Sequence, residues 1–355
     1  MRKNSTMPRA SRGRPASSQP PSRASLADAL PSLERALALS EKQFRQQCFA
    51  FSEMHLASLL AQLREEAMRL YSLALAWPDE TRVSQLALSA ALARKNLSLE
   101  RLAHASRTIH AELRKEDRKA FEQLRALHTS LAVLRLTGPD TPCADDQRRN
   151  EDLCSQSDAL QSALARSSPL MQSIYEQQPP TKLPSQVAAA LPRDGALIEF
   201  VAFKNLPLAS ELASAHSERP AGQPHYLALL LFGDGSTSAI DLGAAAPLEA
   251  AVLLLHRSFT DRSASWQAAA QTLYTFVFRP LISRLGSVRR LFVAPDRWLA
   301  LTPFTELHDG ESSLSDAFEI THLNSGRDLL SRPEGCSPKH SVIFITGLDS
   351  GLQAE

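Results

Sequence analysis

The sequence contains little glycine, few aromatic residues and no long apolar run, and each shortage excludes a class of protein. Its 355 residues include 13 glycines, and they form neither a phosphate-binding Gly-rich loop nor a Gly-x-Ser-x-Gly nucleophile motif. No apolar run reaches the about 18–20 residues that a membrane-spanning helix needs. Aromatic residues make up 6% of the chain, whereas alanine and leucine are abundant, so the composition favours helices over a β-sandwich.

Cysteine is also scarce, which argues against a zinc site and an oxidising compartment. The four cysteines lie far apart, without a Cys-x-x-Cys pair or a histidine at ligand spacing. We therefore predict no metal site and no cofactor, and a reducing, cytoplasmic location. The cysteines are Cys48, Cys143, Cys154 and Cys336.

Charge is nearly balanced over the chain but not along it. Residues 1–24 hold six basic residues and no acidic one, which leaves the remainder at a net charge of −5, against +1 for the whole chain. A body with this balance gives no reason to expect nucleic-acid binding. Residues 1–25 are rich in Arg, Ser and Pro, bury too little apolar surface to offset the entropy of ordering, and are expected to form a disordered basic tail.

The pattern from residue 26 to residue 178 is helical. Leucines recur at spacings of three, four and seven between residues 56 and 73, with charged residues between them. This predicts antiparallel helical hairpins, either an α-solenoid or a bundle, although no clean repeat of about 34 residues is present. Single histidines such as His104, His110 and His128 are interpreted as structural. We expect protein or peptide partners to bind through this region.

Composition changes after a Pro-rich linker at residues 179–186, which is expected to be an extended spacer. Apolar runs at 196–203, 225–232 and 238–242 read as strands, the last two joined by an Asp-Gly hairpin turn. Two helices, at about 246–259 and 266–285, follow. Further strands are expected at 291–294, 318–323 and 341–346, with a helix opening at Gly326. Alternating elements of this kind predict an α/β domain over residues 187–355.

Several motifs in this second region resemble the CHAT domain, a caspase-like domain related to the separases and usually preceded by tetratricopeptide-type helices. The resemblance covers about residues 80 to 347, and residues 291 to 330 are its most specific part. The similar stretches are LPRDGALIEF with the Asp-Gly hairpin, LYTFVFRPLISRLGSVRRLFVAPDRWLALTPFTEL and LSDAFEITHLNSGRDLL, with ALSAALARKNLSLERL and EQLRALHTSLAVL upstream. One departure is Arg297, where the family has glycine, and this predicts a differently shaped loop.

The resemblance implies a cysteine peptidase with a His-Cys dyad, in which a thiolate attacks the scissile carbonyl. The family carries both dyad residues on strands that follow the Ser-Gly-Arg-Asp element, so we expect them beyond Glu355 and predict no catalytic residue here. Cys336 and His340 lie close in sequence, but not at the family's positions. The motif residues expected to be structural or to line a cleft are Asp296, Pro303, Phe304, Ser325, Arg327 and Asp328.

Two hypotheses about function remain open. In the first, the chain is a truncated or disrupted form of a caspase-like protease and is catalytically incomplete. In the second, it acts as it stands, as a non-catalytic helical interaction module with part of an α/β domain. For Arg327 and Asp328, capping and charge pairing of the helix that they open is the alternative to a place in a substrate cleft.

Overall fold

The computed structural model describes most of the chain between residues 23 and 331. The described residues are 23–47, 53–95, 97–98, 110–111, 113–137, 144–168, 172, 178–206, 222–261 and 265–331. Nearly all of the predicted basic tail lies outside this set. So do Cys48, Cys143, Cys336, His340 and the predicted strand at 341–346.

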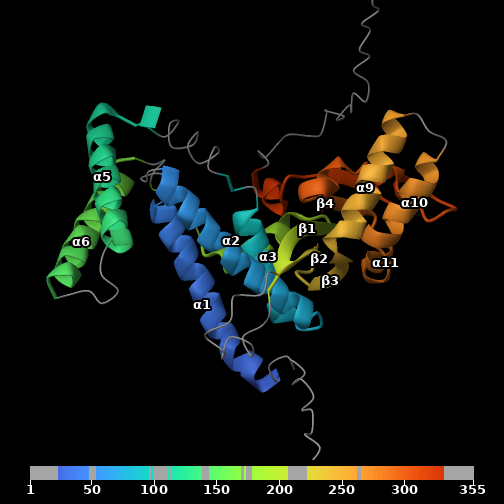
Figure 1. Ribbon diagram of the computed structural model, residues 1–355, viewed down its shortest axis with the longest axis horizontal. Coiled ribbons are helices and arrows are strands. Elements are labelled where there is room, and N and C mark those ends of the chain that lie inside the picture. The colour runs from blue at the N-terminus through green and yellow to red at the C-terminus, as the bar shows by residue number, and fades with distance from the viewer. Residues whose placement is uncertain are drawn as a thin grey trace, which may run out of the picture.

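The amino-terminal region is helical, as its leucine spacing predicts (Figure 1). Helix α3 is rich in alanine, and from Val83 onward all but one of its residues are buried. Small side chains let a helix approach its neighbours closely, so α3 packs against α2 and against the sheet at once. The helices are α1 (Arg23–Gln47), α2 (Glu53–Ala76), α3 (Thr81–Arg94), α5 (Lys115–Thr137) and α6 (Ala144–Ser167).

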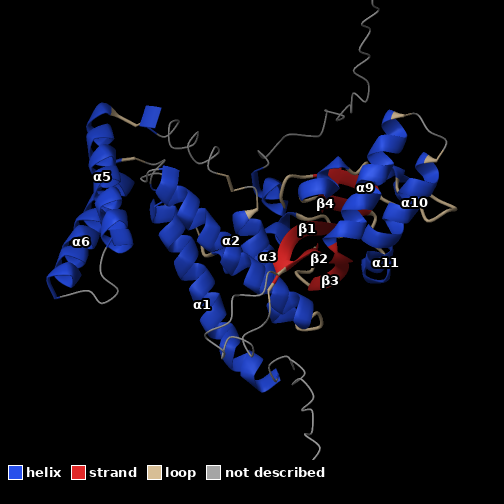
Figure 2. Cartoon of the chain, in the orientation of Figure 1, coloured by secondary structure: helices blue, strands red, loops and turns tan. Residues whose placement is uncertain are grey.

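A five-stranded mixed sheet follows the helices and confirms the predicted α/β class (Figure 2). Its order is β3-β2-β1-β4-β5, in which β4 lies parallel to both β1 and β5, and the β1–β2 and β2–β3 pairs are antiparallel. The β2–β3 hairpin turns through Gly235 at φ 82°, as the Asp-Gly signal predicts. The strands are β1 (Gly195–Asn205), β2 (Gln223–Phe232), β3 (Thr237–Ala244), β4 (Arg290–Ala294) and β5 (Glu319–His322).

Helices cover both faces of the sheet. Alternate residues of β1 point to opposite sides, and both sets are apolar enough to pack against helices. Leu197, Val201 and Phe203 belong to a core shared with α1, α2 and α3. Ile198 and Phe200 belong to a second core, formed with the later helices. These are α9 (Ala245–Thr260), α10 (Trp266–Val277), α11 (Arg279–Leu285) and the short α12 (Leu314–Ala317). Helices from both ends of the chain therefore enclose the sheet (Figure 1).

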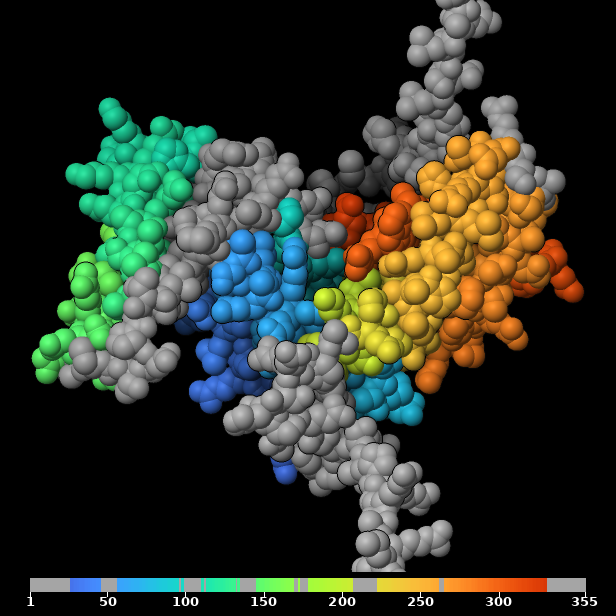
Figure 3. All heavy atoms as spheres, viewed as in Figure 1, coloured from blue at the N-terminus to red at the C-terminus, as the bar shows by residue number. Residues whose placement is uncertain are grey.

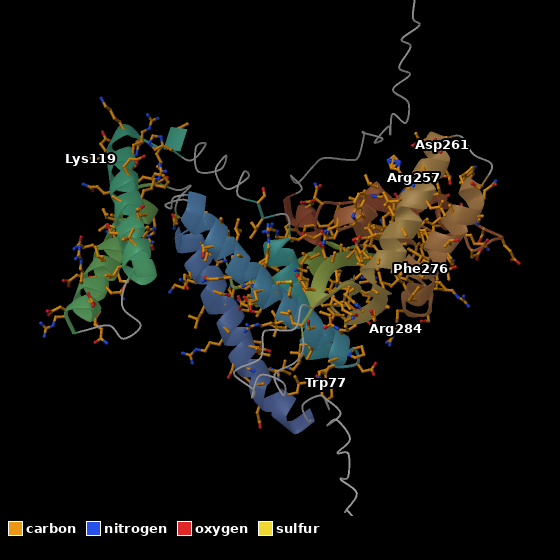
Figure 4. All side chains as sticks on the ribbon, in the orientation of Figure 1. Trp77, Lys119, Arg257, Asp261, Phe276 and Arg284 are labelled. Atoms are coloured by element: carbon orange, nitrogen blue, oxygen red, sulfur yellow. The ribbon has the colours of Figure 1, made fainter. Side chains whose placement is uncertain are left out.

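The outer helices α9 and α10 still expose apolar and charged side chains. Arg257 and Asp261 lie at the end of α9 and Phe276 lies on α10, as labelled in Figure 4.

Among the described residues, no helix is long and apolar enough to cross a membrane.

Helices α5 and α6 form a hairpin set apart from the sheet, seen as the green lobe in Figure 3. Inside it, buried His128 lies 2.6 Å from the Ser157 hydroxyl and 3.3 Å from the Gln161 side-chain nitrogen. These polar groups meet between two helices, so His128 serves the packing of the hairpin, in keeping with its structural interpretation.

One local prediction was wrong, and a second was right about the position of a helix, whose type the structure adds. Residues 180–190 are not an extended spacer but a 3-10 turn (Pro180–Lys182) followed by helix α8 (Leu183–Ala190). Proline is compatible with the first turn of a helix because the amide it lacks has no partner there, and Pro184 occupies that turn. The helix that opens at Gly326 is a 3-10 helix, η5 (Gly326–Ser331), within the described part of the chain.

Candidate functional site at the carboxyl edge of the sheet

The carboxyl ends of β4 and β5 lie at the same edge of the sheet, beside the middle of β1, because β4 runs parallel to both of its neighbours and β1 continues beyond their pairing to Asn205. In open α/β sheets this edge is where ligands bind. Asp296 follows β4, and Ser325 follows β5. The fold therefore brings the predicted motif residues to the edge that such domains use for function.

The centre of this edge holds a buried ion pair between a helix and a strand. Glu199 on β1 has no solvent-exposed surface, and the Lys95 ammonium lies 2.8 Å from its Oε1 atom. Lys95 directly follows α3 and also donates a hydrogen bond of 2.7 Å to the Ala294 carbonyl of β4. Ala294 is paired with Glu199 in the parallel register, so a single ammonium group joins the end of β4 to the middle of β1.

The second oxygen of Glu199 binds the Ser-Gly-Arg-Asp segment. Its Oε2 atom accepts a hydrogen bond of 2.7 Å from the Gly326 amide. Burial raises the pKa of Glu199, while Lys95 and, to a lesser extent, the Gly326 amide act to lower it. The carboxyl group thus links α3, β1 and η5, with both of its oxygens directed at groups of the protein.

Any side chain at position 326 would require two buried leucine side chains to shift. A Cβ atom there would lie 2.4 Å from a methyl carbon of Leu197 and 2.8 Å from one of Leu92. Neither distance is compatible with van der Waals contact. The glycine of the Ser-Gly-Arg-Asp segment is therefore required by the close approach of η5 to α3 and β1, since no left-handed φ is recorded for it.

Asp296 completes the hydrogen bonding of β1 beyond the end of β4. Its Oδ2 atom accepts a hydrogen bond of 2.8 Å from the Ala202 amide, which lies past the last residue that β4 pairs with. Arg297, the next residue, has φ 49° and is the one non-glycine residue with positive φ in the described parts of the chain. The expected avoidance of this conformation by arginine was wrong, and the loop carries the strain instead.

Pro303 and Phe304 place an aromatic ring beneath the same edge. Pro303 precedes the 3-10 turn Phe304–Glu306, and Phe304 is fully buried. The Phe304 ring centroid lies 5.7 Å from that of Phe200 and 5.6 Å from that of His322, the last residue of β5. Burial lowers the pKa of His322. Phe304 acts as a core residue that supports the end of β5.

Ser325, Arg327 and Asp328 fix the start of η5. Asp328 accepts hydrogen bonds from the amides of Asn324 (2.9 Å) and Ser325 (3.3 Å), which caps the turn. Arg327 does not pair with Asp328 but donates a hydrogen bond of 3.3 Å to the Ala93 carbonyl of α3. Ser325 is buried. The capping alternative fits Asp328, and Arg327 instead connects η5 to α3.

Sequence reasoning missed the two residues at the centre of the site. Glu199 is the one residue that is not apolar in the run from Leu197 to Phe203. A carboxylate in the middle of a buried strand indicates a buried partner. Lys95 gives no comparable signal, because a lysine at the end of a helix is ordinarily solvated.

The described residues offer no catalytic or metal-binding cluster at this edge. No group of three or more His, Cys, Asp or Glu side chains in them is arranged to hold a metal ion. Their free cysteine, Cys154, is half-buried on α6, in the hairpin that stands apart from the sheet (Figure 1). The arrangement at the edge can hold elements together, and its ionised groups are directed inward.

Comparison with known proteins gives one match. Residues 267–354 match the family model of the CHAT domain, a stretch that includes β4, β5 and the Ser-Gly-Arg-Asp segment. No curated protein and no solved structure matches the chain. The match confirms the resemblance for the motifs within residues 267–354 and does not extend to the similar stretches upstream.

Proposed function

We propose that this chain, whose residues 267–354 match the CHAT domain, forms the non-catalytic framework of a cysteine-peptidase-type domain. One observation carries this proposal. At the carboxyl edge of the sheet, Glu199, Lys95 and Asp296 all bind the backbone of neighbouring elements. Side chains used in this way hold the edge in shape and do not act on a substrate.

The chemistry of the family supports the same conclusion. A cysteine peptidase needs a thiolate and an imidazole within hydrogen-bonding reach of each other. His322 ends β5, but its ring contacts Phe304, and Cys154 lies on the distant α6. Cys336 and His340 lie outside the described residues and away from the family's positions. The described residues therefore do not bring a thiol and an imidazole together as a dyad.

The test is an activity measurement on the purified 355-residue chain with a panel of fluorogenic peptides covering acidic, basic and apolar residues at the cleavage position. We expect no cleavage above the buffer rate. Cleavage that disappears in Cys336→Ala and persists in Cys154→Ala would overturn the proposal. Coding DNA that continues beyond Glu355 and encodes a strand ending in His-Gly and a later strand ending in Cys would support the proposal. Their absence would favour the second function below.

A second function, partner binding by the helices, is supported by the α5–α6 hairpin. The hairpin stands apart from the sheet (Figure 3), and Val133 on α5 is 52% exposed. A hairpin placed in this way leaves helix faces open to a protein or peptide, with Val133 as one apolar contact point. We extend this proposal in two ways: the helices belong to a tetratricopeptide-like solenoid, and the protein is located in the cytoplasm.

Substitution of matched exposed residues tests the second function. Val133→Asp on α5 and Leu254→Asp on α9 each place a charge on an exposed apolar position, at 52% and 54% exposure. Partners captured by the wild-type chain in quantitative co-purification are expected to be lost with Val133→Asp and kept with Leu254→Asp. Equal retention by both variants would exclude the hairpin as the binding surface.

A further inference from the structure

Three consecutive residues at the end of α3 connect the amino-terminal helices to the carboxyl edge of the sheet. The first connection belongs to Arg94, whose side chain is 4% exposed. Its guanidinium donates hydrogen bonds to the Ser40 hydroxyl of α1 (2.7 Å) and to the Leu63 carbonyl of α2 (3.1 Å). It also lies 2.9 Å from a carboxylate oxygen of Glu66 on α2 and 3.7 Å from one of Glu41 on α1.

The residues on either side of Arg94 reach the opposite way. Lys95 binds Glu199 on β1 and the Ala294 carbonyl of β4. The Ala93 carbonyl accepts the hydrogen bond from Arg327 of η5. One turn of helix therefore has α1 and α2 on one side and the strand ends with η5 on the other.

The charges of this α3 terminus also act on one another. Burial raises the pKa of Glu41, and the nearby guanidinium groups of Arg94, Arg45 and Arg327 each act to lower it. Arg327 belongs to η5, whereas Glu41 belongs to α1. The two elements are therefore linked electrostatically as well as through the backbone of α3.

We propose that the end of α3 couples the position of helices α1 and α2 to the order of the Ser325–Asp328 segment at the carboxyl edge of the sheet. Movement of α1 away from α3 would leave Arg94 buried with fewer acceptors. A buried, unpaired guanidinium is costly, and the cost is relieved when the end of α3 shifts towards water. Ala93 and Lys95 move with Arg94 because the three share one turn, so the contacts to Arg327 and Glu199 weaken together.

This coupling gives the helices a means of controlling the edge. A partner that displaces α1 or α2 would loosen the Ser325–Asp328 segment, and by linkage a ligand that orders the segment would hold the helices in place. The inference does not rest on peptidase activity, because it concerns backbone order. Its test succeeds or fails independently of the cleavage assay above.

Amide hydrogen exchange in the 355-residue chain tests the coupling. The double variant Glu41→Gln/Glu66→Gln removes both carboxylates that face Arg94. Exchange in peptides covering residues 323–331, which contain the Gly326 amide, is expected to become faster by about tenfold or more. Exchange in β2 is expected to stay at the wild-type rate, because β2 lies in the interior of the sheet and touches none of these charges.

The matched control is Glu34→Gln/Glu65→Gln. These carboxylates lie on the same two helices but form exposed pairs with Arg82 and Arg69, at 2.9 Å and 2.8 Å. The control is expected to leave exchange in residues 323–331 unchanged. An unchanged rate in the Arg94-facing variant, or an equal acceleration in β2 that reports general loss of the fold, would overturn the proposal.

Two further variants keep the test decisive. If the double variant does not fold, the single variant Glu66→Gln replaces it, because the Glu66 side chain is 28% exposed and tolerates the change better. In the reverse direction, Arg327→Met removes the bond to Ala93, and exchange in α1 around Ser40 is expected to become faster. Coupling is reciprocal, so an effect in only one direction would also contradict the proposal.

Discussion

The two faces of the sheet are buried equally well but by different chemistry. Ile198 and Phe200 face α9, α10 and α11 in a core where no charged side chain of the described residues is buried. Glu199, between them in sequence, points to the other face and meets Lys95 at the end of α3. Neighbouring residues of β1 thus enter different cores. Ile198 and Phe200 enter an apolar core, whereas Glu199 lies on the face covered by α3, called the charged face below.

This difference in chemistry means that one face mainly stabilises the fold, whereas the other fixes the positions of its elements. Apolar packing stabilises in proportion to the area buried and tolerates changes that conserve volume. A buried ion pair contributes little net stability, but its atoms must stay in place, since a displaced partner leaves a charge unsolvated. We interpret the face that carries the later helices as the source of stability. The α3 face fixes where the carboxyl edge of the sheet lies.

The largest effect is expected from Lys95→Met, which leaves Glu199 buried without its cation. The free energy of unfolding at pH 7 should fall by about 3–5 kcal/mol in urea unfolding followed by circular dichroism. The additional substitution Glu199→Gln should recover most of the loss, because a neutral amide oxygen still accepts the bond from Gly326. A double variant as unstable as Lys95→Met would show that packing, and not charge, causes the loss.

The same variant has a predicted pH dependence. Burial already raises the pKa of Glu199, and Lys95 is the largest influence that lowers it, so removal of Lys95 raises the pKa further. Between about pH 4.5 and this raised pKa, Glu199 is protonated in the native state but ionised in the unfolded chain. The deficit is therefore complete above the raised pKa and shrinks as the pH falls towards 4.5. A deficit independent of pH would contradict the assignment to Glu199.

The apolar face should behave differently when Ile198→Ala is made on the neighbouring residue. Removal of three buried carbon atoms is expected to lower the free energy of unfolding by about 2–5 kcal/mol. The titratable side chains in the core that Ile198 joins are those of Tyr226 and Tyr274, and burial raises the pKa of each above its ordinary value of 10.0, so the loss should not vary between pH 4.5 and 7. The same urea titrations measure it. A loss that shrinks with falling pH, like that of Lys95→Met, would remove the contrast between the faces.

A smaller effect is expected from Gly326→Ala, which adds a methyl group where η5 meets the charged face. The clash with Leu197 at 2.4 Å should cost about 1–3 kcal/mol, measured as a lower urea midpoint. Leu197→Val shortens the side chain that the new methyl group would meet. Gly326→Ala should therefore cost less in that background than in the wild type. Strictly additive losses would indicate that steric contact with Leu197 is not the reason for glycine.

The contrast between the faces was only partly predictable from the sequence. A run of apolar residues located β1, and leucine spacing located the helices, because both patterns act over a few residues. The partnership of Lys95 with Glu199 joins residues more than 100 positions apart, and a single sequence does not specify such contacts. The Ser-Gly-Arg-Asp motif marked the correct edge. Its glycine could not be explained before Leu92 and Leu197 were seen beside it.

The smallest effect, and the one that should stabilise the protein, is expected at Arg297. The residue follows Asp296, which holds β1 through the Ala202 amide, and its φ of 49° is unfavourable for any residue with a Cβ atom. Arg297→Gly should therefore raise the free energy of unfolding by about 1 kcal/mol, seen as a higher urea midpoint. Arg297→Ala is the control, because it removes the guanidinium but keeps the Cβ atom, and it should give no gain. An equal gain in both variants would assign the cost to the arginine side chain. A gain with glycine alone would assign the cost to the left-handed backbone conformation in which Arg297 is held.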